Sequence, residues 1–106
     1  MELPESVSKR IEECGGVEGL RGIVNDDQSL QEMAKRYSAL GDPGRLAIVK
    51  CLKKTDLCVC VIKKITGMSD SQLSYHLAIL KEADLIESCR EGNYIIYSYN
   101  KDAPLL

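Results

Sequence analysis

The sequence predicts a mainly α-helical protein with a small β-hairpin, arranged as a winged helix-turn-helix. Two short helical segments follow each other across a turn at residues 67–69, and after Leu85 the apolar period changes from helical to alternating. A helix-turn-helix followed by a hairpin is the winged-helix arrangement. A chain of 106 residues forms only a modest core, so we expect the fold to be dimeric.

Two helices are expected in the N-terminal part, with an ambiguous stretch between them. Pro4 suits a first helical turn and the glycines after Cys14 suit an end, which predicts a helix from residue 4 to about residue 14. Residues 17–27 stay ambiguous because two glycines interrupt their apolar pattern. A helix is predicted over residues 28–40 from apolar residues at helical spacing, namely Leu30, Met33, Ala34, Tyr37 and Leu40.

The next two helices are expected to begin at N-cap residues. Asp42 followed by Pro43 is a strong helix start. The helix that follows is expected to bury four side chains, Leu46, Ile48, Val49 and Leu52. Thr55 and Asp56 offer a second cap, which predicts a helix over about residues 57–66 that ends at Gly67.

The second helix of the helix-turn-helix and the hairpin complete the predicted fold. Ser69 and Asp70 cap a helix that runs to about residue 83 and turns three leucines inward, Leu73, Leu77 and Leu80. Strands are expected near residues 86–90 and 94–99, around a turn at 91–93. The chain is therefore interpreted as one winged-helix domain over residues 1–106, with residues 1–27 as an N-terminal extension.

Charge is unevenly distributed along the chain. Residues 1–42 hold five Lys or Arg against nine Asp or Glu, a net charge of −4, whereas residues 43–101 hold nine against six, a net charge of +3. A basic C-terminal half suits a nucleic-acid face, although a solvated charge bias without a partner is about as common. Neither a signal peptide nor an apolar run of membrane length is recognisable, so we expect a cytoplasmic protein with no membrane partner. Five cysteines, an odd number, fit reduced thiols better than a disulfide framework.

Four short segments together carry a family resemblance. They are Leu-Gly-Asp-Pro-Gly-Arg-Leu at 40–46, Asp-Leu-Cys-Val-Cys at 56–60, Ser-Tyr-His-Leu-Ala-Ile-Leu at 74–80 and Arg-Glu-Gly at 90–92. In this order, over about residues 39–99, they resemble the ArsR/SmtB family of metal-responsive winged-helix repressors. The resemblance implies a homodimer that represses an operator in double-stranded DNA and releases it when an ion binds. The Leu-Cys-Val-Cys segment resembles the cysteine site of the arsenite, antimonite, cadmium and lead sensors.

Two departures from the family pattern matter. The cysteine motif of the family usually continues with an acidic residue, and here that place holds Val61. The C-terminal helix that carries a His/Asp zinc site in other members has no counterpart after the hairpin. We therefore expect that zinc site to be absent.

Cys58 and Cys60 are the expected grip for a soft As(III), Sb(III), Cd(II) or Pb(II) ion. Residues i and i+2 of a regular helix point about 200° apart and cannot share one ion. The two thiols can chelate together only if the first helical turn is open or distorts on binding. Capture of the ion would then remodel the start of this helix and tilt the recognition helix packed on it. The helix N-terminus should also lower the thiol pKa.

A third ligand is needed because two thiolates rarely satisfy a heavy ion. Cys14 is the candidate, from the same chain or from the partner, because related cadmium sensors place extra cysteines in such an extension. Its alternative is an incidental thiol before a glycine cap. Cys51 is expected to be a buried core residue and Cys89 a free thiol. His76, the only histidine, shares the inward side of its helix and is expected to pack there.

The outward face of the predicted recognition helix supplies the candidate DNA contacts. Gln72 can pair with adenine, and hydroxyl groups suit bases or phosphates. The full set of predicted DNA-binding residues is Ser71, Gln72, Ser74 and Tyr75 on the helix, with Arg90 and Asn93 at the wing. The alternative for each is plain solvated surface. No catalytic triad, paired acid or phosphate-binding glycine loop is recognisable, which argues against an enzyme.

Two further functions stay open. One is a repressor of the same fold in which Cys58 and another cysteine sense oxidants. The other is a winged-helix module for protein interaction, with a structural zinc at the cysteines. For the homodimer, we expect the interface to use the N-terminal helices, where Leu30, Met33 and Tyr37 form an apolar stripe.

Overall fold

The computed structural model describes residues 2–25, 27–103 and 105. The chain divides into two compact units, Met1–Gln31 and Glu32–Leu106. The border lies within α3 (Asp27–Leu40), close to the predicted end of the N-terminal extension. A single domain over the whole chain stays a prediction. None of the helices in the described ranges is long and apolar enough to cross a membrane.

The N-terminal unit is a pair of short helices without a core of its own. Helices α1 (Glu5–Glu13) and α2 (Gly16–Val24) pack on each other, yet neither contains a buried residue. The stretch that was ambiguous in the sequence is thus helical over Gly16–Val24. Glycine is required at position 19, because a Cβ atom there would lie 2.5 Å from the carbonyl oxygen of Cys14. The close approach of the two helices therefore depends on this glycine.

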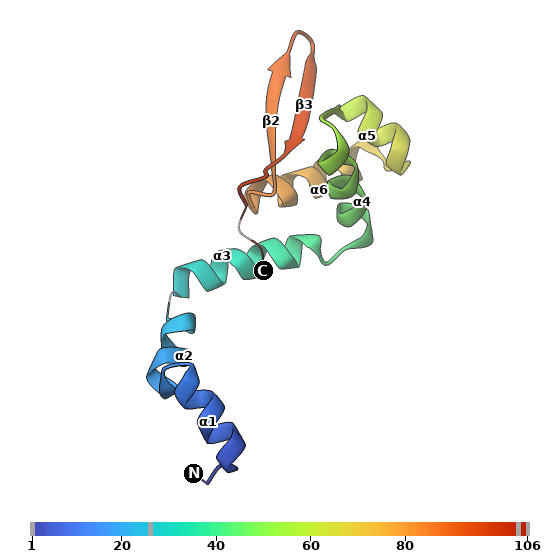
Figure 1. Ribbon diagram of the computed structural model, residues 1–106. Helices are drawn as coiled ribbons and strands as arrows, with labels where there is room; N and C mark the ends of the chain where they lie inside the picture. The colour runs from blue at the N-terminus through green and yellow to red at the C-terminus, as the bar shows by residue number, and fades with distance from the viewer. Residues whose placement is uncertain (1, 26, 104, 106) are drawn as a thin grey trace. The chain divides into compact units, whose positions relative to one another are not determined.

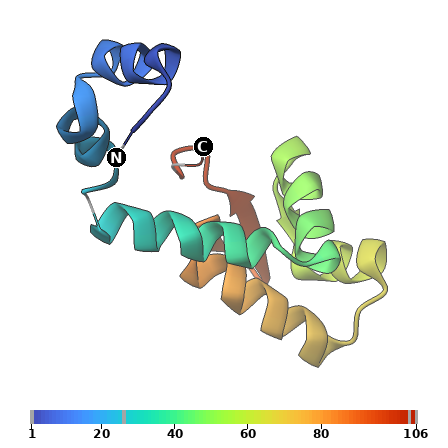
Figure 2. The ribbon, with the colours of Figure 1, turned by 90° about the horizontal axis from the view of Figure 1, so that it is seen from below.

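The second unit has the predicted winged helix-turn-helix fold. It continues from the end of α3 through α4 (Pro43–Lys54), β1 (Leu57–Cys58), α5 (Val59–Thr66), α6 (Asp70–Glu82), β2 (Ile86–Glu91) and β3 (Tyr94–Tyr99) (Figure 1). Helices α5 and α6 follow each other at an angle across a short turn (Figure 2). The three strands form an antiparallel sheet in the order β1-β3-β2. The wing is thus a hairpin extended by one short strand.

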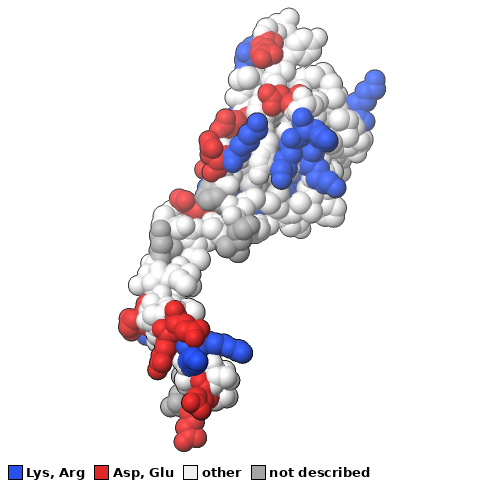
Figure 3. All heavy atoms as spheres, viewed as in Figure 1, with Lys and Arg blue, Asp and Glu red and all other residues white. Residues whose placement is uncertain are grey.

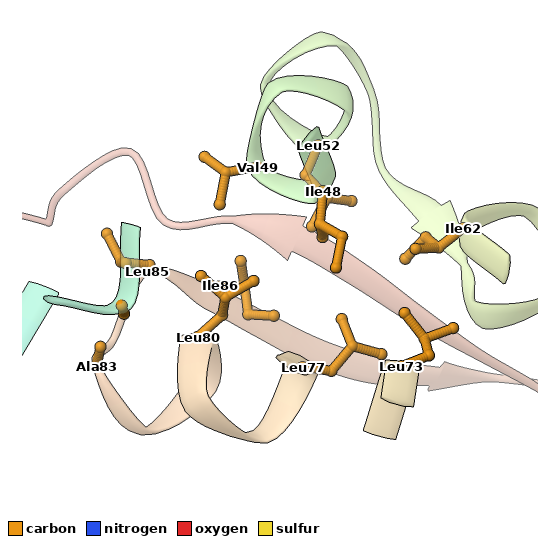
Figure 4. Close-up of a cluster of buried hydrophobic side chains, with 11 residues drawn as sticks. Ile48, Val49, Leu52, Ile62, Leu73, Leu77, Leu80, Ala83, Leu85 and Ile86 are labelled. Atoms are coloured by element: carbon orange, nitrogen blue, oxygen red, sulfur yellow. The ribbon is translucent and has the colours of Figure 1, made fainter. Parts of the chain in front are cut away.

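The core lies between α4, α5, α6 and the base of the wing (Figure 4). Three residues of α4 point into it, with Ile62 of α5 and the three predicted leucines of α6; the α4 residues are Ile48, Val49 and Leu52. Leu80 and Leu85 are fully buried. The expectation for Leu46 was wrong, because its side chain is 45% exposed. It lies on the solvent side of α4.

The start of the fifth helix differs from the prediction. The helix begins at Val59, with Cys58 as its N-cap, rather than after Thr55 and Asp56. Residues 57 and 58 are instead strand β1, in which Leu57 pairs with Tyr97 and Cys58 pairs with Ile96 of the wing. This tertiary pairing, which the local sequence does not encode, delays the helix by two residues. It places Cys58 outside the helix and Cys60 in its first turn.

Candidate metal site and DNA interface

The two predicted metal-binding thiols lie side by side where β1 becomes α5. Cys58 has an extended backbone, with φ −79° and ψ 158°. Its Sγ atom is 2.7 Å from the Sγ atom of Cys60. The geometric objection to an i and i+2 pair in a helix is therefore removed, because Cys58 lies before the helix. Of the two expected alternatives, an open first turn or one that distorts on binding, the structure has the open one.

The two thiols differ in acidity. A hydrogen bond from Cys60 lowers the pKa of Cys58, and the backbone N–H of Val61 is the next cause. The same hydrogen bond raises the pKa of Cys60. Cys58 Sγ makes no full capping hydrogen bond with the first turn, so the helix start acts on it electrostatically. This hydrogen bond therefore makes Cys58 the more acidic thiol of the pair and Cys60 the less acidic one.

A groove of about 490 Å³ joins the thiol pair to the DNA-reading elements. Its lining includes both sulfur-bearing residues, Asp70 at the start of α6 and Asn93 at the wing turn. Lys63 also lines it and forms an ion pair with Asp70, with 2.7 Å between Nζ and Oδ1. Sequence reasoning missed this ion pair, because Lys63 and Asp70 lie on different helices and no local signal joins them. The thiols, the start of α6 and the wing turn therefore border one groove, so a change at the thiols occurs next to both candidate DNA-binding elements.

The other cysteines do not join this pair as a ready-made site. Cys14 is exposed and is the C-cap of α1 in the N-terminal unit. Cys51 is half-buried in α4, and Cys89 is exposed on β2. Among residues 2–25, 27–103 and 105, no three His, Cys, Asp or Glu side chains are grouped to hold an ion. Within the described winged-helix unit, the structure thus brings two sulfur atoms together, those of Cys58 and Cys60.

The predicted reading face of α6 is open to solvent. Ser71, Gln72, Ser74 and Tyr75 are all exposed, and Tyr75 is 63% exposed. Gln72 has an additional task, because its Oε1 accepts a hydrogen bond from the backbone N–H of Ser69 at 3.0 Å. The hydroxyl of Ser69 in turn accepts from the backbone N–H of Gln72. This capping box occupies the amide oxygen and leaves the amide NH₂ group to reach outward.

The wing presents its two predicted DNA contacts near the tip. Arg90 and Asn93 are exposed, and the Arg90 Nε donates to the carbonyl oxygen of Gly92 at 3.2 Å. This bond leaves the terminal nitrogens of the guanidinium to solvent. On the face seen in Figure 3, Lys and Arg gather over the winged-helix unit, whereas Asp and Glu dominate the N-terminal unit. The basic surface therefore coincides with the unit that carries the recognition helix.

His76 packs between helices, as the sequence predicted. It is half-buried on α6, and its Nδ1 atom is 3.1 Å from Nη1 of Arg45 on α4. No local pattern indicates the role of Arg45, which lies 31 residues earlier in the chain. The contact joins two of the segments that carry the family resemblance.

Comparison with known proteins decides the family. The sequence model described as "Bacterial regulatory protein, arsR family" matches residues 42–88, which hold α4 to the first residues of β2. The arsenical resistance operon repressor of Bacillus subtilis is 34% identical over 69% of this chain and 70% of its own length. The chain belongs to the ArsR family. It is accordingly a transcriptional regulator with a DNA-binding winged helix, and not an enzyme.

Two further ArsR-family relatives extend this comparison. A transcriptional repressor SmtB homolog from Synechocystis sp. is 37% identical over 72% of this chain, and the match spans 57% of that protein. The homodimeric winged helix-turn-helix DNA-binding domain of a possible ArsR-family regulator from Mycobacterium bovis has a TM-score of 0.70 at 30% identity. That match covers 76% of this chain and 75% of the other. The residues that the family model matches, 42–88, all lie in the winged-helix unit.

Proposed function

We propose that this ArsR-family protein is a repressor that releases its operator when a soft metal or metalloid ion binds Cys58 and Cys60. The observation that carries the proposal is the pair of sulfur atoms, 2.7 Å apart, in a groove that is also lined by Asp70 of α6 and Asn93 of the wing turn. Thiolates select soft ions such as As(III), Sb(III), Cd(II) and Pb(II). A relative named as an arsenical resistance operon repressor is consistent with such an inducer.

The pair is prepared for the exchange of a proton for an ion. Cys58, whose pKa is lowered by the hydrogen bond from Cys60, would lose its proton more readily, and Cys60 would have to lose its own proton as the ion binds. Cys14, from the same chain or the partner, is our proposed third ligand, because two thiolates rarely satisfy a heavy ion. When bound, the ion would take the place of the shared proton and cross-link the sulfur ligands.

Release of DNA would follow from the connections of Cys58 and Cys60. Cys58 is paired with Ile96 of β3, so a shift of this residue is carried into the wing. Cys60 lies in the first turn of α5, one turn before Lys63, which holds Asp70 of the recognition helix. The two cysteines thus reach the two DNA-reading elements through different contacts. A small displacement at the sulfurs would change the angle between α6 and the wing.

The DNA face is proposed to use both elements. Ser71, Ser74 and Tyr75 would enter the major groove with the Gln72 amide, while Arg90 and Asn93 would reach the backbone or minor groove from the wing. These side chains are exposed in the described structure. A palindromic operator requires two copies related by a two-fold axis.

We propose a homodimer built on the N-terminal helices. Tyr37 and Leu30 on α3 are 39% and 45% exposed, and several apolar residues of α2 are exposed as well, namely Val17, Leu20, Ile23 and Val24. A helix pair with no buried residue gains its stability from packing on another surface. Light scattering at micromolar concentration should give the mass of a dimer. A monomer would contradict this part of the proposal.

The test of the function is a titration of DNA affinity with arsenite or Cd(II) under a phosphine reductant. The probe is a duplex from the region upstream of the gene for this chain, with a random duplex of equal length as control. Ultraviolet absorption of the ion–sulfur bonds is read at the same time. We expect operator affinity to fall as the absorption saturates. Saturation without any loss of affinity would refute ion-controlled release.

A second candidate function uses the same thiol pair as an oxidant sensor. The lowered pKa of Cys58, caused first by the hydrogen bond from Cys60, favours attack on a hydroperoxide. The Cys58 thiolate would become a sulfenic acid with loss of hydroxide, and a second thiol would then form a disulfide with loss of water. Release by hydrogen peroxide without any metal ion would favour this function. Failure to bind either duplex would favour a protein-interaction module with a structural zinc.

A further inference from the structure

Arg45 connects three helices of the winged-helix unit. Its Nε atom donates to the carbonyl oxygen of Ala39 in the last turn of α3, at 2.6 Å. Its Nη1 atom reaches His76 Nδ1 on α6, at 3.1 Å. Its own backbone N–H donates to the Asp42 side chain, which caps α4. One arginine therefore joins the end of α3, the start of α4 and the middle of the recognition helix.

The chemistry of this contact fixes the role of the His76 ring. A guanidinium has only donors, so His76 Nδ1 has to be the acceptor. The proton of the neutral ring is then on Nε2. Loss of the Nδ1 acceptor would leave a half-buried guanidinium nitrogen of Arg45 without this partner. Leaving a charged donor without its acceptor costs more free energy than the loss of a neutral hydrogen bond, so this single contact can matter for stability.

The surroundings leave little freedom for the His76 ring. A Cβ atom added at Gly44 would lie 2.7 Å from Met68 Cε and 3.8 Å from His76 Nε2. The backbone N–H of Arg45 is the largest cause that lowers the pKa of Asp42, and the charge of Arg45 acts in the same direction. The start of α4 thus packs closely against the His76 side chain of α6 and offers it polar contacts.

His76 also touches a predicted DNA contact. Its ring meets the ring of Tyr75 edge to face, with centroids 5.4 Å apart and planes at 64°. Tyr75 is 63% exposed, whereas His76 is half-buried. The His76 ring therefore contacts the exposed Tyr75 ring from the side of the protein interior. Edge-to-face aromatic pairs of this kind are favourable beyond simple burial.

We propose that His76 is a positioning residue for DNA binding. Held by Arg45, it fixes the recognition helix against the start of α4 and supports the Tyr75 ring at the DNA face. This inference rests on the proposed function, since it requires α6 to read DNA. The core leucines of α6 are fully or almost fully buried and anchor this helix to the core. Its loss should therefore misplace the helix rather than unfold the protein.

The experiment compares three replacements of His76 in the full-length protein. His76→Asn places an amide oxygen near the position of Nδ1 and keeps the acceptor, whereas His76→Gln places it further out and His76→Leu has no acceptor. Affinities are measured for the upstream duplex and for random DNA. We expect His76→Leu to lose about tenfold in operator affinity, as for the loss of a charged hydrogen bond. His76→Asn should stay closer to wild type than His76→Gln.

Arg45→Met supplies the matched change on the other side of the contact. Together with His76→Leu it completes a double-mutant cycle, and the loss in the double variant should be smaller than the product of the two single losses. Far-ultraviolet circular dichroism and the urea unfolding midpoint show that each variant is folded, and ion binding at Cys58 and Cys60, followed by ultraviolet absorption, should be unchanged. The inference would be overturned if the loss of operator affinity in the double variant equals the product of the two single losses. Equal operator affinity of the Asn, Gln and Leu variants would overturn it as well. A wild-type protein that binds neither duplex would overturn the proposed function instead.

Discussion

Helices α5 and α6 follow each other directly in the chain, yet their N-termini are held by different means. At α6, Ser69 and Gln72 form a reciprocal capping box. At α5, the cap residue is Cys58, whose side chain makes no capping hydrogen bond and is engaged with Cys60 instead. The first N–H groups of a helix need partners. The recognition helix therefore starts from a closed, preorganised turn, whereas α5 starts from a turn that a new ligand can rearrange at low cost.

This difference matches a division of labour between the helices. A helix that reads base edges benefits from a fixed start, because its side chains have to be presented at defined positions. A helix that senses an ion needs a start that responds to its side chains. The short strand β1 and the groove with Asp70 and Asn93 connect the two starts. Substitutions at the two caps should therefore separate ion sensing from DNA reading.

The largest effect is expected from removal of either sulfur at the start of α5. Cys58→Ser and Cys60→Ser should each keep operator binding but lose release by arsenite, cadmium or lead. Serine preserves the shape of the site and is a good N-cap, but its hydroxyl is a hard ligand. The measurement is the operator affinity with and without each ion.

The other cysteines supply controls for this prediction. Cys51→Ser and Cys89→Ser should respond to ions like wild type, because these residues lie on α4 and β2 outside the thiol pair. Cys14→Ser should weaken the response without removing it. With Val61 in place of an acidic ligand, zinc should release the operator less well than arsenite, cadmium or lead. If the Cys58→Ser and Cys60→Ser variants still dissociate from the operator at the ion concentrations that release the wild-type protein, the pair is not the sensor.

A smaller effect is expected from the reading residue of α6. Gln72→Ala should reduce operator affinity by about tenfold, the lower part of the range for a lost base contact, and change random DNA less. Arg90→Ala should weaken both duplexes alike and lower the salt slope by about 1. Because Gln72 is also part of the capping box, Ser69→Ala is the matched control. If Gln72→Ala loses the same affinity for the operator as for random DNA, the main role of Gln72 is in the capping box.

The cap itself has a measurable worth. Ser69→Ala should lower the free energy of unfolding by about 1 kcal/mol, the usual value for a lost N-cap. Cys58→Ala should cost less, because Cys58 Sγ makes no capping bond. Urea unfolding of the two variants compares the helix starts directly. A larger loss at Cys58 than at Ser69 would reverse the contrast between the two helices.

The sequence was sufficient for most of the fold, because its signals there are local. Asp42 before Pro43, the cap residues Ser69 and Asp70, and the change to alternating apolar residues after Leu85 mark elements that the structure contains. Strand β1 was missed because its two residues are extended only through pairing with β3. Residues 57–58 have no strand pattern of their own. Tertiary pairing here outweighed the local cap signal at Thr55 and Asp56.

The candidate site was predictable in composition but not in geometry. The spacing of Cys58 and Cys60 identified the thiols, yet their approach depends on the extended backbone of Cys58, which follows from β1. The Lys63–Asp70 ion pair and the Arg45–His76 contact join residues on different helices. Such contacts depend on how the helices pack. A single sequence without covariation gives no access to them.

The last and smallest effect concerns the acidity of Cys58. Cys60→Ala removes the hydrogen bond that is the largest cause of the lowered Cys58 pKa, so this pKa should rise towards its ordinary value. Less thiolate would then be present at neutral pH, and alkylation of Cys58 by iodoacetamide should become slower. In Cys60→Ser the pKa of Cys58 should rise less, because the serine hydroxyl can still donate a hydrogen bond to the Cys58 thiolate. The measurement is the alkylation rate of Cys58 against pH, located by peptide mass spectrometry. An unchanged profile in Cys60→Ala would assign the acidity of Cys58 to the N–H groups at the start of α5, of which Val61 is the foremost. The open cap, rather than the second thiol, would then prepare the site for an ion.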